Sequence, residues 1–248
     1  ANLKGQPMVT APEQARGKLS GIADLFLDHD RRILFRADDS VLRPCARSAR
    51  GPSFCQIRRS RGYVPGLITL PRPLEGSVLA VGGDLKSAPA LGSGRDLHLG
   101  AYVGDLEDPE TEQDFREQIG RLLELYALHP QRVVCDPHPL YVSGAWARGS
   151  GLGPVLTVQH HHAHVLSVMA EHGLEEAIGL AFDGTGYGAD GTIWGGEFLH
   201  ATRRGFTRLG HFGSFRLPGG ESAVLHPLRI ALALLIEAGA EAAALLPE

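Results

Sequence analysis

Short apolar runs alternate with amphipathic stretches along the middle of the chain, and this alternation predicts an α/β fold. Runs rich in β-branched residues, each ended by a polar or glycine-rich tip, predict buried strands at 77–81, 132–136 and 154–158. Apolar residues at helical spacing predict helices at 111–128 and 141–148. Strands that alternate with helices are typical of layered α/β domains. Two further short strands are predicted at 97–99 and 101–103.

The pattern changes from residue 177 onward, where strands follow one another without helices between them. Strands are predicted at 178–182, 194–202 and 206–212, followed by a helix at 227–238. We interpret this part as the hairpin-rich start of a second lobe.

The first 65 residues form a separate compositional block, with a predicted helix at 12–19 and strand candidates at 25–27, 33–36 and 54–59. Pro65, Pro71 and Pro73 follow closely, and proline removes a backbone donor and fixes φ. We therefore predict a linker at 66–75 between a domain at 1–65 and another at 76–248, with a long ordered loop as the alternative.

Composition and charge argue against several classes of protein. Hydrophobic residues make up 43% and charged residues 21%, as in ordinary globular proteins, and the net charge of -4 gives no basic excess for nucleic-acid binding. The three cysteines form no CxxC pair, which argues against a disulfide framework and favours a reducing, cytoplasmic compartment. Neither a signal sequence nor an apolar run of membrane-spanning length is found, so no membrane partner is expected.

A histidine-rich run, Gln159-His160-His161-His162-Ala163-His164, is the most distinctive chemical feature. On a helix, the four-residue spacing of His160 and His164 puts both imidazoles on one face, where they can bind one metal ion such as zinc or iron. His161 and His162 point elsewhere and are assigned supporting or substrate-facing roles. The alternative is a partly buried histidine group with no metal. A metal site needs a third ligand, expected to be a carboxylate from elsewhere.

A second motif, Asp183-Gly184-Thr185-Gly186-Tyr187-Gly188, follows a predicted buried strand. A carboxylate at a strand end and a glycine-rich turn with free N–H groups can hold a phosphate and its metal ion. A plain β-hairpin turn explains the pattern equally well.

Three more candidates lie at strand ends or in a basic segment. Asp84 and Lys86 follow a strand and could position a metal or water and neutralise a phosphate, although a plain turn is favoured. His138, in the rigid tip Asp136-Pro137-His138-Pro139, is a candidate substrate contact or a structural turn residue. The cluster Arg58, Arg59 and Arg61 could bind phosphate or form a solvated strand edge.

The order of these motifs resembles the HypF family of hydrogenase-maturation carbamoyltransferases over nearly the whole chain. The segments that carry the resemblance are Ser60–Pro65, Gly82–Lys86, Gly104–Glu107, Asp136–Pro139, Gln159–His164, Phe182–Gly188 and Asp190–Phe198. The resemblance implies that 1–65 is the end of a YrdC-like domain and that 76–248 begins a TsaD-like domain of the actin/sugar-kinase superfamily.

The same resemblance implies a two-step reaction. The YrdC-like domain would make carbamoyl adenylate from ATP, with Mg²⁺, and carbamoyl phosphate. Its nucleotide site would include Asn2, Ser40 and Arg43, which lie in segments similar to that family's. The TsaD-like domain would pass the carbamoyl group to the C-terminal cysteine of a HypE-like partner, as a precursor of a cyanide ligand of the nickel-iron centre.

His160 and His164 match the family's metal pair, and its third ligand is an aspartate expected in the second half of the TsaD-like domain. Both ends of the chain look cut, so we expect a part of a longer enzyme that is inactive alone. An O-carbamoyltransferase of natural-product biosynthesis and a non-catalytic metal- or nucleotide-binding scaffold are the alternatives.

Overall fold

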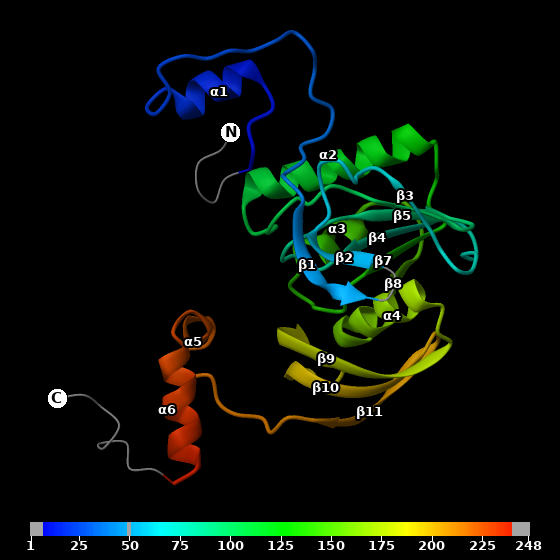
Figure 1. Ribbon diagram of the computed structural model, residues 1–248, viewed down its shortest axis with the longest axis vertical. Helices are drawn as coiled ribbons and strands as arrows, with labels where there is room; N and C mark the ends of the chain where they lie inside the picture. Colours follow the sequence, from blue (N-terminus) through cyan, green and yellow to red (C-terminus); the bar gives the residue numbers. More distant parts are fainter. Residues whose placement is uncertain (1–6, 49–50, 240–248) are drawn as a thin grey trace, which may run out of the picture.

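The centre of the molecule is a six-stranded sheet with the strand order β3-β6-β5-β4-β7-β8 (Figure 1). The structure is a computed structural model that describes residues 7–48 and 51–239. The strands of this sheet are β3 (Leu67–Thr69), β4 (Val78–Gly82), β5 (Ala90–Ser93), β6 (Asp96–Leu99), β7 (Arg132–Cys135) and β8 (Val155–Thr157). Strands β4, β7 and β8 run parallel, so their carboxyl ends meet at one edge, where ligands bind in open α/β sheets.

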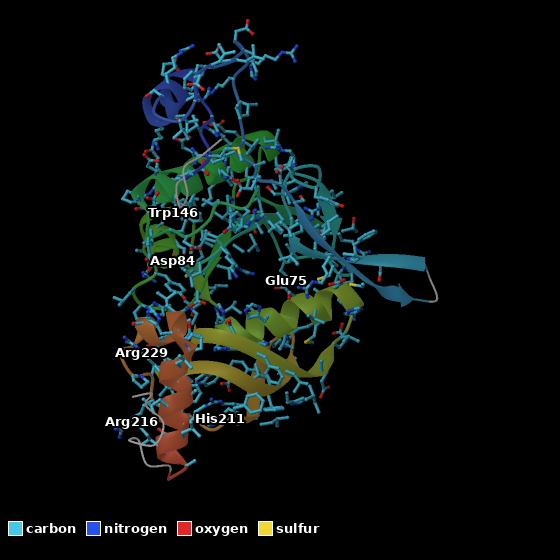
Figure 2. All side chains as sticks on the ribbon, turned by 60° about the vertical axis from the view of Figure 1, so that its left-hand side comes forward. Glu75, Asp84, Trp146, His211, Arg216 and Arg229 are labelled. Atoms are coloured by element: carbon cyan, nitrogen blue, oxygen red, sulfur yellow. The ribbon has the colours of Figure 1, made fainter. Side chains whose placement is uncertain are left out.

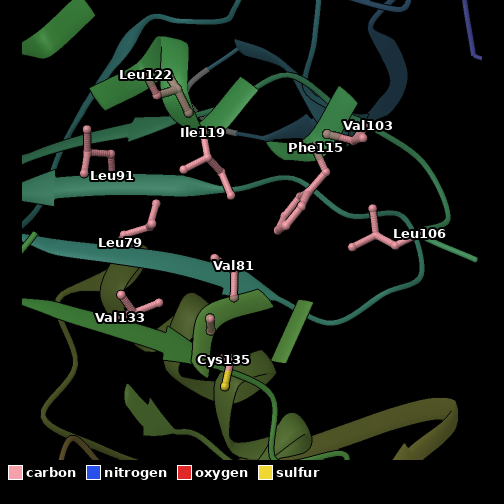
Figure 3. Close-up of a cluster of buried hydrophobic side chains, with 11 residues drawn as sticks. Leu79, Val81, Leu91, Val103, Leu106, Phe115, Ile119, Leu122, Val133 and Cys135 are labelled. Carbon is pink, nitrogen blue, oxygen red and sulfur yellow. The ribbon is translucent and has the colours of Figure 1, made fainter. Parts of the chain in front are cut away.

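Helices α2 (Pro109–Tyr126) and α3 (Val142–Gly149) pack on this sheet and close the main core. Helix α2 begins where the side chain of Asp108 accepts a hydrogen bond from the backbone N–H of Thr111 at 2.9 Å. Its apolar stripe then faces the sheet. Figure 3 shows this core, whose buried side chains include Leu79, Val81, Leu91, Leu106, Phe115, Ile119, Leu122 and Val133.

A second, three-stranded antiparallel sheet has the order β11-β10-β9 and lies below the first in Figure 1. Its strands are β9 (Glu176–Tyr187), β10 (Ile193–Thr202) and β11 (Gly205–His211). Helix α4 (His160–His172) packs on it through Val165 and Met169, which contact Leu199 and other small apolar residues of β9 and β10. Helix α4 thus joins the edge strand β8 of the first sheet to the second sheet.

The other face of the second sheet carries three aromatic residues, of which Phe182 and Phe212 are exposed and Phe198 is half-buried. Phe182, Phe198 and Phe212 form a mutual cluster with ring centroids 5.2 to 5.9 Å apart. The last described elements are the short helix α5 (Glu221–Leu225) and α6 (Pro227–Glu237), and none of the residues of α6 is buried.

The N-terminal residues contact α2 through Lys18, Leu34 and Arg36. They form α1 (Pro12–Leu19) and the antiparallel hairpin of β1 (Val41–Ser48) and β2 (Gly51–Arg58). Arg36 pairs with the buried Asp114 of α2 at 3.0 Å, and burial raises the pKa of that carboxyl while Arg36 opposes the shift. The predicted linker at 66–75 contains β3, which pairs with β6 and extends the sheet. The proposed domain boundaries themselves stay a prediction.

Most of the predicted helices and strands are confirmed, with ends that differ by at most five residues, and the α/β fold class is confirmed with them. Three strand predictions are wrong. Residues 25–27 and 33–36 form no strand, and Leu25 and Leu27 are largely exposed because no partner strand lies beside them. Residues 101–103 form no strand: Val103 N–H donates to the carbonyl of Ser87 at 2.8 Å, and next to it lies only an isolated bridge between Ser87 and Gly104. The sequence patterns missed β1, β3, β5 and α5.

In the described part of the chain, none of the helices combines the length and the apolar character that crossing a bilayer requires.

Candidate metal centre

The carboxyl edge of the parallel strands gathers the polar residues predicted from the sequence. Asp136 follows β7 directly, and Gln159 lies between β8 and α4. The Gln159 side chain accepts a hydrogen bond from the backbone N–H of His162 at 2.9 Å, which caps α4 and fixes its start at His160. His160 and His164 therefore lie one turn apart on the same face of α4, as the sequence predicts.

Three potential ligand atoms converge at this point. His160 Nε2 lies 2.7 Å from Asp183 Oδ2 and 3.2 Å from His164 Nε2. His164 Nε2 lies 3.6 Å from the same carboxylate oxygen, and one ligand atom from each of the three residues lies within 4.8 Å of the others. Two imidazoles and one carboxylate are a common donor set for catalytic zinc and for non-haem iron, both of which keep open positions for substrate. These residues fit a divalent metal.

A β-bulge brings Asp183 to the histidines. Phe182 pairs with Gly196 and Gly186 with Trp194, so four residue steps on β9 face only two on β10. The extra residues bend the strand, and bulges of this kind re-aim side chains beside active sites. A Cβ atom on Gly195 would lie 2.8 Å from the carbonyl oxygen of Asp183, so glycine opposite the bulge permits the close approach.

The glycine motif is therefore mainly a strand and not an open turn. Residues 183–187 belong to β9, the bulge included, and Gly188 N–H donates to the carbonyl of Thr192 at 2.8 Å in the hairpin that follows. The hairpin turn between β9 and β10 contains Asp190 and Gly191. Phosphate binding by Gly184, Thr185, Gly186 and Gly188 stays a prediction.

Close packing against α4 explains why position 186 is a glycine, and the effect of replacing it is a first testable prediction. A Cβ atom there would lie 2.6 Å from Cε1 of His161 and 2.9 Å from Cδ2 of His160. We expect Gly186→Ala to push β9 away from α4 and to lower the unfolding free energy of this region by about 1–3 kcal/mol. Hydrogen exchange of the β9 amides in the full-length protein measures this. Gly184→Ala is the matched control because a Cβ there meets no atom within 4 Å; equal protection in both variants would contradict the expectation.

His160 is also held from its other side. Its Nδ1 lies 2.8 Å from Oδ2 of Asp136. This hydrogen bond is the largest cause that raises the pKa of His160, with a further contribution from Asp183, while burial acts in the opposite direction. The ring is thus placed between two carboxylates.

His161 and His162 are buried and point away from this site, so they are core residues here. His162 Nε2 lies 3.0 Å from the carbonyl oxygen of Thr202. His161 Nδ1 lies 3.1 Å from Gln159 Nε2, and burial lowers the pKa of His161. The supporting or substrate-facing roles assigned to them from the sequence stay a prediction.

Asp84 and Trp146 are labelled on the same side of the molecule in Figure 2. The contacts of the Asp84 side chain are structural. Its two carboxylate oxygens accept hydrogen bonds from the backbone N–H groups of Val142 at 2.7 Å and Ser143 at 2.9 Å. Asp84 therefore caps the start of α3 from a distant loop. Lys86 adopts a left-handed conformation with φ 52°, its backbone N–H donates to Asp105 at 2.8 Å, and its residue is exposed. Catalytic roles for Asp84 and Lys86 stay predictions.

His138 is near the candidate metal ligands because the residues that its ring contacts lie beside them. Its ring stacks on Tyr141 at 4.1 Å and meets the edge of Tyr187 at 5.2 Å. Burial raises the pKa of Tyr141, and the nearby carboxylates of Asp136, Asp84 and Asp183 raise it further, so its hydroxyl remains a donor beside an acidic cluster. This position is compatible with the predicted substrate contact.

The predicted nucleotide-binding residues of the N-terminal part lie apart from this centre in the chain, and several have local partners. Ser40 Oγ donates to the carbonyl of Arg61 at 2.8 Å, and Arg61 pairs with Asp39 at 3.2 Å. Arg59 Nη2 donates to the carbonyl of Gly66 at 3.4 Å, and Arg43 lies exposed in β1. Asn2 lies outside the described residues. Nucleotide binding by these residues stays a prediction.

Sequence reasoning missed a buried ion pair behind the site. Glu197 is 2% exposed and receives two hydrogen bonds from Arg208, at 2.6 and 3.1 Å. The guanidinium group also lies 4.0 Å from the Trp194 ring centroid, and Trp194 Nε1 donates to Asp190 at 2.9 Å. Hydrogen bonds from Thr192 are the main cause that lowers the pKa of Asp190 to about 2. An acidic residue at an inward position of a strand was the available signal for Glu197.

A cavity of about 480 Å³ lies beside the metal candidates, and its residues come from the start of α4 and from two hairpin turns. Its lining contains Gln159, Tyr187, Arg203 and Arg204, but none of the three candidate ligands. The cavity is a neighbouring space and not the metal centre itself.

Comparison with known proteins defines the class first. Residues 73–171 match the family model described as the HypF Kae1-like domain. Residues 179–247 match the model of the second subdomain of the Kae1-like domain of carbamoyltransferases. The two-sheet arrangement with the site near their junction is thus a Kae1-like domain.

Individual relatives then define the family. The Carbamoyltransferase HypF of Synechocystis is 46% identical over 236 residues, which cover 94% of this chain and 30% of the relative. The probable carbamoyltransferase HypF of Methanocaldococcus jannaschii is 36% identical, over 98% of this chain and 32% of the relative. Full-length HypF, crystallised in a phosphate- and nucleotide-bound form, superposes with a TM-score of 0.86 at 39% identity, over 94% of this chain and 36% of that chain. The chain belongs to the HypF family and spans about a third of the length of these relatives.

Proposed function

We propose that this chain is the part of a HypF-type carbamoyltransferase that carries the transfer site. The observation that supports this most strongly is the convergence of His160, His164 and Asp183 at the carboxyl edge of a Kae1-like lobe. Relatives whose names state carbamoyltransferase activity match over most of the chain.

In the proposed reaction, the whole enzyme first hydrolyses carbamoyl phosphate with one water molecule to carbamate and phosphate. The carbamate oxygen then bonds to the α-phosphorus of ATP, with Mg²⁺, which gives carbamoyl adenylate and releases pyrophosphate. The carbamoyl carbon then bonds to the thiolate sulfur of the C-terminal cysteine of a HypE-like partner, and AMP leaves with the electron pair of the broken C–O bond. The reducing cytoplasm suits an acceptor that must stay a free thiol.

The residues of this chain have distinct parts in that transfer. His160, His164 and Asp183 would hold a divalent ion, zinc or iron, which when bound would polarise an oxygen of the substrate as a Lewis acid. Asp136 orients His160, and the Tyr141 hydroxyl and the His138 ring offer polar contacts beside the site. The acidic groups Asp84, Asp136 and Asp183 near Tyr141 favour cations over free anions here.

An exchange assay distinguishes a carbamoyltransferase from a non-catalytic scaffold. It measures whether the full-length, metal-loaded protein exchanges pyrophosphate into ATP in the presence of carbamoyl phosphate. We expect exchange only when carbamoyl phosphate is present. Absence of exchange in an intact, metal-loaded preparation would rule out the transferase and favour the non-catalytic scaffold.

The chemical group that accepts the carbamoyl group distinguishes the HypF-type transferase from the O-carbamoyltransferase. A peptide that ends in cysteine and the same peptide ending in serine present a thiol and a hydroxyl at the same place. Carbamoylation of the thiol peptide alone, measured by mass spectrometry, supports the HypF-type reaction, whereas carbamoylation of hydroxyl compounds would favour the O-carbamoyltransferase.

A further inference from the structure

Asp136 is a buried carboxylate with two separate partners. Its side chain is 5% exposed and lies directly after β7. Oδ2 lies 2.8 Å from Nδ1 of His160, and Oδ1 accepts a hydrogen bond from the backbone N–H of His138 at 2.8 Å. Both oxygens are therefore used, and the carboxylate cannot rotate without breaking one of these contacts.

The contact with Nδ1 decides which nitrogen of His160 can bind a metal. A carboxylate accepts but does not donate, so the proton of the imidazole resides on Nδ1 when Asp136 is ionised. The lone pair of a neutral His160 is then on Nε2, the atom that lies near His164 and Asp183. Without Asp136, the ring can adopt the other tautomer or turn about its side-chain bonds.

Neither Asp183 nor His164 can substitute for this contact. Both approach His160 from the Nε2 side, so they hold the ring only where the metal would bind. The contact on the opposite side belongs to Asp136, whose own position is fixed by the rigid tip that contains Pro137 and Pro139.

We propose that Asp136 is a positioning residue that orients His160 through Nδ1 so that Nε2 completes the metal site with His164 and Asp183. The same carboxylate holds the backbone of His138, so one side chain sets the distance between the metal ligands and the loop that carries the His138 ring. This proposal rests on the proposed metal-dependent function.

Cobalt(II) binding to the full-length protein tests the proposal, because Co²⁺ reports affinity and ligand geometry through its visible absorption. We expect Asp136→Ala to weaken Co²⁺ binding about 10- to 100-fold and to shift the absorption bands, as for other partners of metal-bound histidines. Asp136→Asn should give a smaller loss, since its amide oxygen still accepts a hydrogen bond from Nδ1. Asp114→Asn is the matched control: that carboxylate is equally buried, 5% exposed, but lies on α2 with Arg36 as its partner.

The possible outcomes separate this inference from the function on which it rests. Co²⁺ affinity and absorption bands unchanged in both Asp136 variants, with wild-type protein binding one ion at this site, would overturn the positioning role alone. A lowered melting temperature without a change in Co²⁺ affinity would do the same, since it would indicate only a loop-stabilising contact with His138. Wild-type protein that binds no Co²⁺ would overturn both the inference and the metal-dependent function. If Asp136→Ala does not fold, the comparison of Asp136→Asn with Asp114→Asn decides.

Discussion

Replacement of His160 by alanine is expected to abolish metal binding at micromolar concentrations and to stop carbamoyl transfer to a thiol acceptor. His160 is the central member of the group, since its Nε2 is within 3.2 Å of both other candidates. Its loss also leaves the buried carboxylate of Asp136 without its histidine partner. Because loss of an outer partner alone costs about 10- to 100-fold in affinity, we expect removal of the ligand itself to cost more than about 100-fold.

Metal analysis and two activity measurements check this expectation in the full-length protein. Exchange of pyrophosphate into ATP should persist, because we assign that step to the YrdC-like domain, whereas transfer to the acceptor should be lost. His172→Ala is the matched control: His172 is an exposed histidine in the last turn of the same helix. Unchanged metal content in His160→Ala, together with normal transfer, would contradict the assignment of the site.

Arg208→Met is expected to destabilise the second sheet by about 3–5 kcal/mol, the cost of leaving a buried charge without its partner. Glu197 is almost completely buried, and Arg208 donates two hydrogen bonds to it from the neighbouring strand β11. Arg208 also covers the Trp194 ring, so its removal exposes an aromatic surface as well. The effect should concentrate in β9, β10 and β11.

Hydrogen exchange resolves that local effect in a long protein. The exchange rates of the β10 and β11 amides should rise roughly a hundred- to several-thousand-fold, which corresponds to the expected free energy at 1.4 kcal/mol for each tenfold change. The double variant Glu197→Leu with Arg208→Met should recover much of the lost protection, because a buried pair replaced by apolar residues leaves no unpaired charge. If the double variant is no more protected than Arg208→Met alone, the loss does not come from the orphaned Glu197 carboxylate.

Local patterns predicted the parts of the molecule that depend on local geometry. The pairing of His160 with His164 follows from helical spacing and from the cap at Gln159, all within six residues. The strands β4, β7 and β8 were predicted from short apolar runs rich in β-branched residues, which is a local signal.

Contacts between distant segments could not be predicted in this way. The motif at Asp183 predicted a site for a phosphate and its metal ion or a plain hairpin turn, but not that the carboxylate lies beside the histidines, because this depends on a bulge and on pairing with β10. The local pattern at Asp84 also gave no sign that its carboxylate caps a helix that begins 58 residues later, and its catalytic role stays a prediction. Residues 25–27 carry a strand-like pattern, but a strand also needs a neighbour, and none lies beside them in the described part of the chain. The aspartate ligand expected in the second half of the TsaD-like domain stays a prediction, and the sequence did not show that Asp183 also brings a carboxylate to the two histidines.

The bulge in β9 also affects which sequence changes this family of sites can accept during evolution. The side chains of a strand alternate between its two faces, so the loss or gain of one residue moves every following side chain to the opposite face. Deletion of residue 184 or 185 would turn either Asp183 or Gly186 away from the histidines, although both residues would still be present in the sequence. The number of residues in this segment is thus as strongly constrained as their identity. Whether a distant relative has the same site is better judged by the spacing from Asp183 to Gly195 than by the number of identical residues.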